Sequence, residues 1–200
     1  MKVGIFGGTF DPIHNGHLGV AEEVKTRLNL TKIIFVPAGQ PLLKMALSVT
    51  AAEDRFEMVR LAIAGKPYFE LSRTEIDRAG PSYTVDTIAE FKDISDPGSE
   101  LYFMLGWDSL SEIDRWREPL RLMSMCYPVA VHRPGTLRPD LQSMEVSVPG
   151  ILERVIILDK PVIDVSATVI RDYVVKGLSI RHFVPEIVAD YIQRNKLYLK

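Results

Sequence analysis

Two histidines in a glycine-rich loop are the residues of this chain best placed to do chemistry. His14 and His17 lie three positions apart in the segment Gly7-Gly8-Thr9-Phe10-Asp11-Pro12-Ile13-His14-Asn15-Gly16-His17. An apolar run precedes this segment and a helical pattern follows it, so both imidazoles fall on one side of a helix's first turn. Glycines allow close approach of the backbone to a ligand, and the free N–H groups of a helix start attract an anion. The loop therefore predicts a phosphate site, in which cationic imidazoles would offset developing negative charge.

A second candidate phosphate element lies near the other end of the chain. Ser166, Thr168 and Arg171 open a helical pattern that follows the apolar run at 155–158. Ser166 is a natural N-cap, and helical side chains point back toward the N-terminus, so Arg171 reaches the same entrance as the two hydroxyls. In isolation this pattern is more often a capped helix with a surface arginine. Together with the histidine loop, it favours a clamp for a triphosphate.

The elements that must position these loops alternate along the chain. Apolar runs at 3–6, 32–36, 68–75, 101–105, 128–132 and 155–158 predict strands, and amphipathic patterns at 17–28, 84–91, 118–125, 168–176 and 186–196 predict helices. One more helix is indicated by a capping box, Thr50-x-x-Glu53, with Phe56, Val59, Ala62 and Ile63 on its buried side. The pattern predicts an α/β fold: a Rossmann-like, doubly wound, mostly parallel sheet with helices on both faces. We expect one domain over 1–200, with a C-terminal helical part at about 166–200.

Composition narrows the function classes. The chain has 200 residues and a net charge of −2, without the basic excess typical of proteins that bind nucleic acid. Its one cysteine excludes an internal disulfide and a four-cysteine zinc site. The apolar runs are too short to span a membrane, and the first strand turns into glycines too soon for a signal peptide, so we expect a cytoplasmic protein. The metal ligands and the oligomeric state, a homo-oligomer included, stay open.

Other ligands for the first loop fit less well. Two histidines at this spacing can bind a metal, but no cysteine or third histidine lies near them. The loop is not Gly-x-Gly-x-x-Gly, and the second predicted strand ends in Val36-Pro37-Ala38 with no acidic residue for a ribose. The sequence therefore argues against an NAD-binding module.

The two loops resemble the paired signatures of the nucleotidylyltransferase superfamily, (H/T)xGH and ISSTxxR. More narrowly, the chain resembles the bacterial nicotinate-nucleotide adenylyltransferases. Further matching segments are Val36-Pro37-Ala38-Gly39-Gln40-Pro41, Pro81-Ser82-Tyr83-Thr84-Val85-Asp86-Thr87, Gly106-Trp107-Asp108-Ser109-Leu110 with Trp116, and the stretch at 177–185. They occur in the family's order between residues 3 and 198, and jointly they are specific.

This resemblance implies transfer of AMP from ATP to nicotinate mononucleotide, with Mg²⁺, giving deamido-NAD and pyrophosphate in NAD biosynthesis. The family's mechanism is a direct in-line displacement. By the resemblance the catalytic residues are His14, His17 and Arg171, with His17 on the α-phosphate and His14 on the β- and γ-phosphates. ATP would be bound by Gly8, Thr9, Phe10, His14, His17, Asp108 (at the ribose), Ser166, Thr168 and Arg171. The mononucleotide would be bound by Lys44, Tyr83, Thr84, Trp116 and Arg117, with Trp116 stacking on the nicotinate ring.

Two departures from the family pattern bear on phosphate affinity. Leu43 stands where the family commonly has a histidine, which leaves Lys44 to supply that contact, and Ala167 stands where the superfamily signature has a serine. Two alternatives stay open. One is an adenylyltransferase for nicotinamide mononucleotide or another phosphate acceptor. The other is a non-catalytic nucleotide sensor on the same fold, favoured by Leu43 and opposed by the retained histidines.

Overall fold

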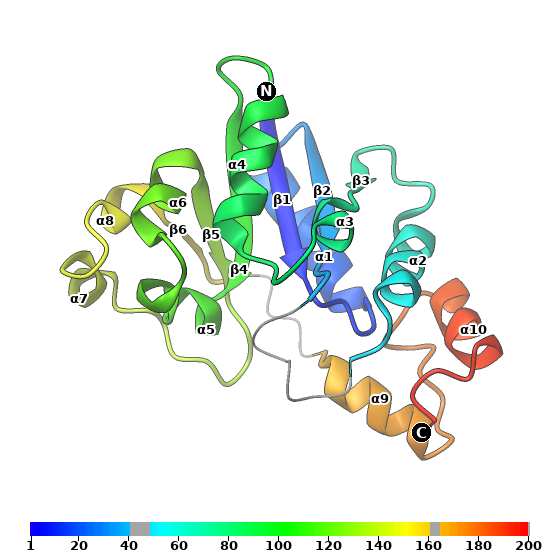
Figure 1. Cartoon of the computed structure of the whole chain (residues 1–200). Helices are drawn as coiled ribbons and strands as arrows, with labels where there is room; N and C mark the ends of the chain where they lie inside the picture. The colour runs from blue at the N-terminus through cyan, green and yellow to red at the C-terminus, as the bar shows by residue number, and fades with distance from the viewer. Residues whose placement is uncertain (41–48, 161–164, 200) are drawn as a thin grey trace.

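The computed structural model of the chain describes residues 1–40, 49–160 and 165–199 (Figure 1). Its centre is one parallel sheet of six strands: β1 (Lys2–Gly8), β2 (Lys32–Pro37), β3 (Phe69–Leu71), β4 (Glu100–Gly106), β5 (Tyr127–Val131) and β6 (Ile156–Leu158). Their order across the sheet is β3-β2-β1-β4-β5-β6. The chain winds outward from β1 in one direction and then from β4 in the other. This confirms the doubly wound fold and places the switch point between β1 and β4, where such sheets bind ligands.

Helices cover both faces of the sheet. They are α1 (Asn15–Arg27), α2 (Ala52–Ile63), α3 (Thr74–Asp77), α4 (Thr84–Ile94), α5 (Trp107–Leu110), the 3-10 turn η2 (Ile113–Arg115), α6 (Pro119–Met125), α7 (Leu141–Glu145), α8 (Ile151–Arg154), α9 (Ala167–Val175) and α10 (Glu186–Arg194). Alternate residues of β1 face opposite sides, as a pleated strand requires. Phe6 joins a core with α1, α2, α9 and α10, whereas Ile5 joins a second core with α4, α5 and α6.

The C-terminal elements belong to the first of these cores. Ile170 of α9 and Val188 and Ile192 of α10 are buried in the same cluster as Phe6. The backbone N–H of Asn15, at the start of α1, also donates to the carbonyl of Phe183 at 2.8 Å. Figure 1 shows α9 and α10 side by side at the lower right, next to the end of α2. The last helices therefore pack around the histidine loop.

Some predicted boundaries are wrong for local reasons. The strand expected at 68–75 is only β3, because its second half turns into α3. The capping box does not form: Ala51 precedes α2 with no side-chain cap. On α2, Phe56 is half-buried, and Arg55 and Met58 take the buried positions. The short helices α3, α5, α7 and α8 escaped prediction, because four or five residues give no readable helical period.

In the ranges that the structure describes, no helix is long and apolar enough to cross a membrane.

Candidate active site

The two histidines of the first loop hold each other in place. His14 is the N-cap of α1, and its Nδ1 accepts a hydrogen bond from the backbone N–H of His17 at 3.3 Å. In return, Nδ1 of His17 accepts from the backbone N–H of His14, also at 3.3 Å. The rings stack with centroids 3.6 Å apart and planes 19° apart. The geometry is a capping box in which imidazoles replace the usual hydroxyl and carboxylate.

These bonds fix the chemistry of both rings. A ring nitrogen that accepts a hydrogen bond carries no proton, so in each neutral imidazole the proton lies on Nε2, the atom turned away from the backbone. Burial, and after it the charge of Arg133, lower the pKa of His14 to about 4. His14 is therefore neutral at pH 7 before a ligand binds. The cationic form expected from the sequence needs a bound phosphate to raise its pKa.

The ring of Phe10 packs against the ring of His17. Phe10 is buried with a φ of 50°, and its ring meets the edge of His17 with centroids 5.0 Å apart. Gly8 makes this possible, because a Cβ at Gly8 would lie 2.9 Å from the Phe10 ring. The side chain of Phe10 is thus in the core, and the contact that the resemblance implies between Phe10 and ATP is one through the backbone.

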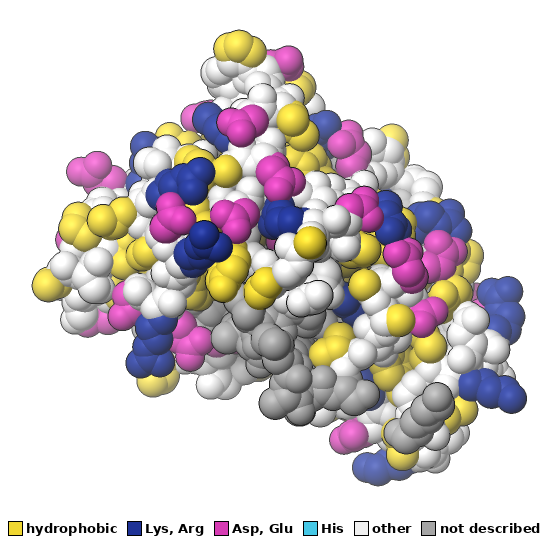
Figure 2. Space-filling view, viewed as in Figure 1, with side chains coloured by type: hydrophobic (Ala, Val, Ile, Leu, Met, Phe, Trp, Pro, Cys, Tyr) yellow, Lys and Arg dark blue, Asp and Glu magenta, His cyan; other side chains and the backbone are white. Residues whose placement is uncertain are grey.

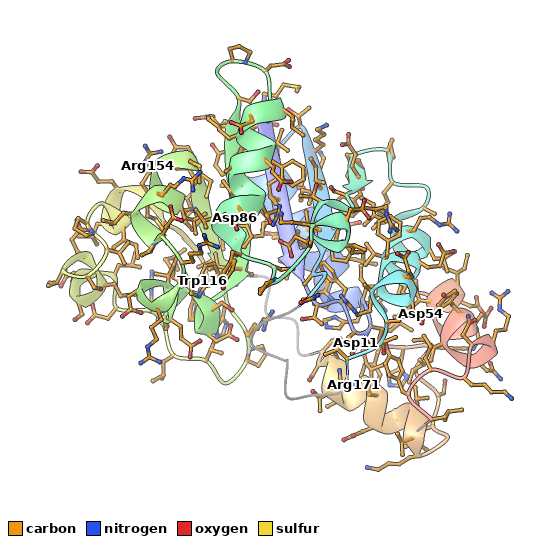
Figure 3. All side chains as sticks on the ribbon, in the orientation of Figure 1. Asp11, Asp54, Asp86, Trp116, Arg154 and Arg171 are labelled. Carbon is orange, nitrogen blue, oxygen red and sulfur yellow. The ribbon has the colours of Figure 1, made fainter. Side chains whose placement is uncertain are left out.

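Arg171 joins the two predicted phosphate elements. Its Nη1 donates to the backbone carbonyl of Asp11 at 2.7 Å, and its Nη2 donates to Oγ1 of Thr168 at 3.3 Å. Figure 3 shows Arg171, in the middle of α9, beneath Asp11. Ser166 is the N-cap of α9, as predicted, but its side chain makes no capping bond. Arg171 therefore lies against the histidine loop although 160 positions separate it from Asp11, and its role in binding a triphosphate stays a prediction.

A buried polar network beneath the loop was missed at the sequence level. Arg55 is 1% exposed and donates to the carbonyls of Thr9 at 2.8 Å, Ala38 at 2.7 Å and Thr50 at 2.9 Å. Burial lowers the pKa of Arg55, and the charge of Asp11 opposes that shift. One signal was readable: an arginine falls in register with Val59 and Ala62 on an otherwise apolar stripe.

Asp11 links this network to the C-terminus. It is buried, and its Oδ1 accepts from the hydroxyl of Tyr198 at 2.8 Å while its Oδ2 accepts from the backbone N–H of Thr50 at 3.3 Å. Burial is the main cause that raises the pKa of Tyr198, so this phenol stays protonated and donates. The loop before α1 is therefore fixed by partners from α2 and from the end of the chain.

The predicted mononucleotide residues gather at the start of α4. The guanidinium of Arg117 lies over the ring of Tyr83, 4.7 Å from its centroid, and Nη1 of Arg117 lies 3.6 Å from Oδ2 of Asp86. Trp116 is half-buried with its ring edge-on to Phe103, and Figure 3 shows it just below Asp86. No side chain caps α4, whose first residue is Thr84. The backbone N–H groups at the start of α4 therefore lie next to an aromatic residue, Tyr83, which is the N-cap of the helix. Lys44 and Leu43 lie outside the described residues.

At the end of β4, Asp108 faces a residue that the sequence reading did not select. Oδ2 of Asp108 lies 3.4 Å from Nη1 of Arg133, which follows β5. Arg133 could have been found from the sequence by its position, because it lies just past the carboxyl end of a predicted strand and ligands bind along that edge of the sheet.

Over the described ranges, no group of three or more His, Cys, Asp or Glu could hold a metal ion.

Comparisons with known proteins agree with this geometry. The cytidylyltransferase-like family model matches residues 5–173. A Dehalococcoides mccartyi protein named "Probable nicotinate-nucleotide adenylyltransferase" is 46% identical over 200 residues, covering 100% of this chain and 98% of its own. A Thermomicrobium roseum protein of the same name is 42% identical over 198 residues, which cover 98% of this chain and 91% of the relative.

Solved structures support the fold. The nicotinic acid mononucleotide adenylyltransferase of Plasmodium falciparum, complexed with NaAD, superposes with a TM-score of 0.79 over 98% of this chain and 97% of its own, at 21% identity. That identity shows a shared fold and nothing finer. The full-length sequence relatives and the family model carry the assignment: this chain belongs to the cytidylyltransferase-like family and, within it, to the nicotinate-nucleotide adenylyltransferases.

Proposed function

We propose that this protein transfers the AMP group of ATP to nicotinate mononucleotide, giving deamido-NAD and pyrophosphate. The observation that carries the proposal is the bond from Arg171 to the carbonyl of Asp11, because it joins both phosphate elements into one site. The adjoining start of α4 supplies a place for the second substrate. The family assignment supports the same reaction.

The reaction needs no nucleophile from the protein. An oxygen of the mononucleotide phosphate attacks the α-phosphorus of ATP, and the bond from that phosphorus to the bridging oxygen breaks, with its electron pair leaving on pyrophosphate. Catalysis then rests on holding the two phosphates in line and on stabilising charge. Nδ1 of His14 and of His17 already accepts a backbone N–H. The histidines therefore act as Nε2 donors to phosphate oxygens rather than as bases.

The start of α4 favours an acceptor that carries a carboxylate. The uncapped N–H groups at Thr84 and the positive end of the helix dipole favour an anion over a neutral amide. Trp116 would stack on the pyridine ring, and the backbone around Arg117, whose side chain pairs with Asp86 and Glu118, would offer a further donor to the carboxylate. We therefore propose nicotinate mononucleotide, rather than nicotinamide mononucleotide, as the preferred acceptor.

Mg²⁺ enters this proposal as part of the substrate MgATP. A magnesium ion bound by substrate phosphates needs only one or two protein carboxylates and keeps several waters. Its charge would offset that of the β- and γ-phosphates, which His14 and Arg171 also face.

Three further features of the protein bear on its partners, its domain structure and its compartment. Acidic and basic side chains are interspersed on the face drawn in Figure 2, which supports small-molecule substrates rather than nucleic acid. The shared core of the C-terminal helices supports one domain over residues 1–200. The buried, free Cys126 suits the reducing cytoplasm.

The test is to incubate the protein with MgATP and each mononucleotide in parallel and to measure pyrophosphate. We expect release with nicotinate mononucleotide and about 10-fold or more lower kcat/KM with the amide, the worth of one charge-assisted contact. A strong preference for the amide would overturn the acceptor assignment. No release with either acceptor, while ATP still binds, would favour the nucleotide sensor.

A further inference from the structure

Arg133 and Asp108 share a space at the switch point of the sheet. Gly106 ends β4 there, and a Cβ on Gly106 would lie 2.3 Å from Oδ1 of Asp108 and 3.0 Å from Nε of Arg133. Both side chains therefore lie against the backbone of Gly106, in room that only a glycine leaves. β4 is the strand next to β1, whose carboxyl end leads into the histidine loop. The guanidinium of Arg133 is thus held beside the predicted phosphate site by a strand neighbouring that loop.

Arg133 also lies within electrostatic reach of His14. Its charge is the second cause, after burial, that lowers the pKa of that imidazole. The guanidinium charge is therefore felt at the His14 ring, although that ring is itself neutral at pH 7. An anion at Nε2 of His14 would therefore also be attracted by Arg133.

The contact that holds Arg133 is easily exchanged. Its ion pair with Asp108 spans 3.4 Å, and the two side chains are 55% and 48% exposed. Exposed pairs of this kind contribute little to stability. A polyphosphate offers a guanidinium a stronger, bidentate partner than one carboxylate at this distance.

We propose that Arg133 is a further phosphate-binding residue of this site: on ATP binding its guanidinium leaves Asp108 and contacts the β- and γ-phosphates. When the bond between the α-phosphorus and its bridging oxygen breaks, Arg133 stabilises the charge that develops on the departing pyrophosphate. The exchange also frees the carboxylate of Asp108 to accept hydrogen bonds from the ribose hydroxyls. This inference rests on the proposed function.

The experiment compares Arg133→Ala with Arg138→Ala by calorimetric titration with MgATP and with AMP, which lacks the β- and γ-phosphates. Arg138 is a matched control, since it lies in the same loop, is 66% exposed and pairs with Asp159 at 4.0 Å. We expect Arg133→Ala to weaken ATP binding about 10- to 100-fold and to leave AMP binding within about twofold. Arg138→Ala should change neither.

The reverse reaction gives a second readout. For Arg133→Ala, the KM for pyrophosphate should rise by a similar factor while the KM for the dinucleotide stays near that of the wild type. Arg133→Lys keeps the charge without the bidentate fork and should fall between the two, which also covers a case in which Arg133→Ala fails to fold. Equal losses for ATP and AMP, or no loss for either, would overturn the proposal.

These outcomes separate the inference from the proposed function. If the wild type transfers AMP and Arg133→Ala behaves like it, only the role of Arg133 is wrong. If the wild type releases no pyrophosphate but binds ATP through Arg133, the inference stands and the transfer reaction does not. The binding arm needs no acceptor, so it gives a result in either case.

Discussion

The two helix starts that face the phosphate site are built in opposite ways. At α1, His14 and His17 cap each other's backbone, Phe10 supports the ring of His17, and the loop before them is fixed from below. At α9, Ser166 occupies the N-cap position but makes no capping bond with its side chain. Each start carries residues that the sequence assigns to phosphate, yet only at α1 do these side chains cap the backbone of the helix.

The difference indicates that the two helix starts have different roles, the first in the reaction and the second in binding ATP. A preorganised donor costs nothing to orient when charge develops, so the α1 start suits the reacting α-phosphate. The α9 start, by contrast, has a hydroxyl left to offer an incoming anion and is held to the first loop by Arg171. We therefore expect changes at α1 to alter stability and kcat, and changes at the α9 cap to alter mainly the affinity for ATP.

Removing the support beneath the first loop should produce the largest effect. Arg55→Met removes the donor from four backbone carbonyls, one of them that of Gly39 at 3.3 Å, and leaves the buried Asp11 without its neighbouring charge. We expect the free energy of unfolding to fall by about 3–5 kcal/mol, measured by urea denaturation. Arg60→Met, on the same helix with only a surface pair to Glu57, should change it by about 0.5 kcal/mol or less. Equal effects of the two changes would show that the α1 loop does not depend on this network.

His17→Ala should have the next largest effect and should act on catalysis. It removes one Nε2 donor from a preorganised pair, so we expect kcat to fall by about 10²–10³-fold, with little change in the KM for the mononucleotide. His17→Gln is the control for stability, because glutamine at this position can still accept the N–H of His14 as in an ordinary capping box. A His17→Gln variant with unchanged kcat would mean that the cap matters and the imidazole does not.

The buried state of His14 predicts how stability depends on pH. Its pKa is about 4 in the folded protein and 6.5 in the unfolded chain, so between these values the unfolded chain binds more protons. The stability contributed by the neutral ring is complete above pH 6.5 and is lost as the pH falls to about 4, a change of about 3 kcal/mol. His14→Asn keeps a good N-cap and removes this titration. Urea denaturation of both proteins from pH 7 to pH 4 should give a steeper loss for the wild type; parallel curves would contradict the assignment.

How far the sequence could predict this site depends on the kind of interaction. The paired histidines and Arg171 were readable, because a glycine turn after a strand and a capped helix start are local patterns. The fold followed from the alternation of strands and helices. Both kinds of signal come from residues close together in the chain.

The network that fixes the first loop was not readable in the same way. Tyr198 meets Asp11 across 187 positions, and Arg55 bonds to carbonyls of two separate loops. Such partners become neighbours only after the sheet has ordered its strands. Thr50 illustrates the same limit: its position suggests a cap, but tertiary contacts use its backbone to bond Asp11 and Arg55 instead.

Ser166→Ala should have the smallest effect and is the sharpest test of the contrast between the two helix starts. Since the Ser166 side chain makes no capping bond in the protein without ligand, its loss should change the free energy of unfolding by no more than about 0.5 kcal/mol. With ATP bound, one hydrogen bond to a phosphate would be missing, so the KM for ATP should rise about 2- to 10-fold at unchanged kcat. Thermal unfolding with and without MgATP, together with steady-state kinetics, measures both. A variant destabilised without ligand would show that the α9 start is as complete as that of α1, and the proposed division between a preformed and a ligand-completed half would be wrong.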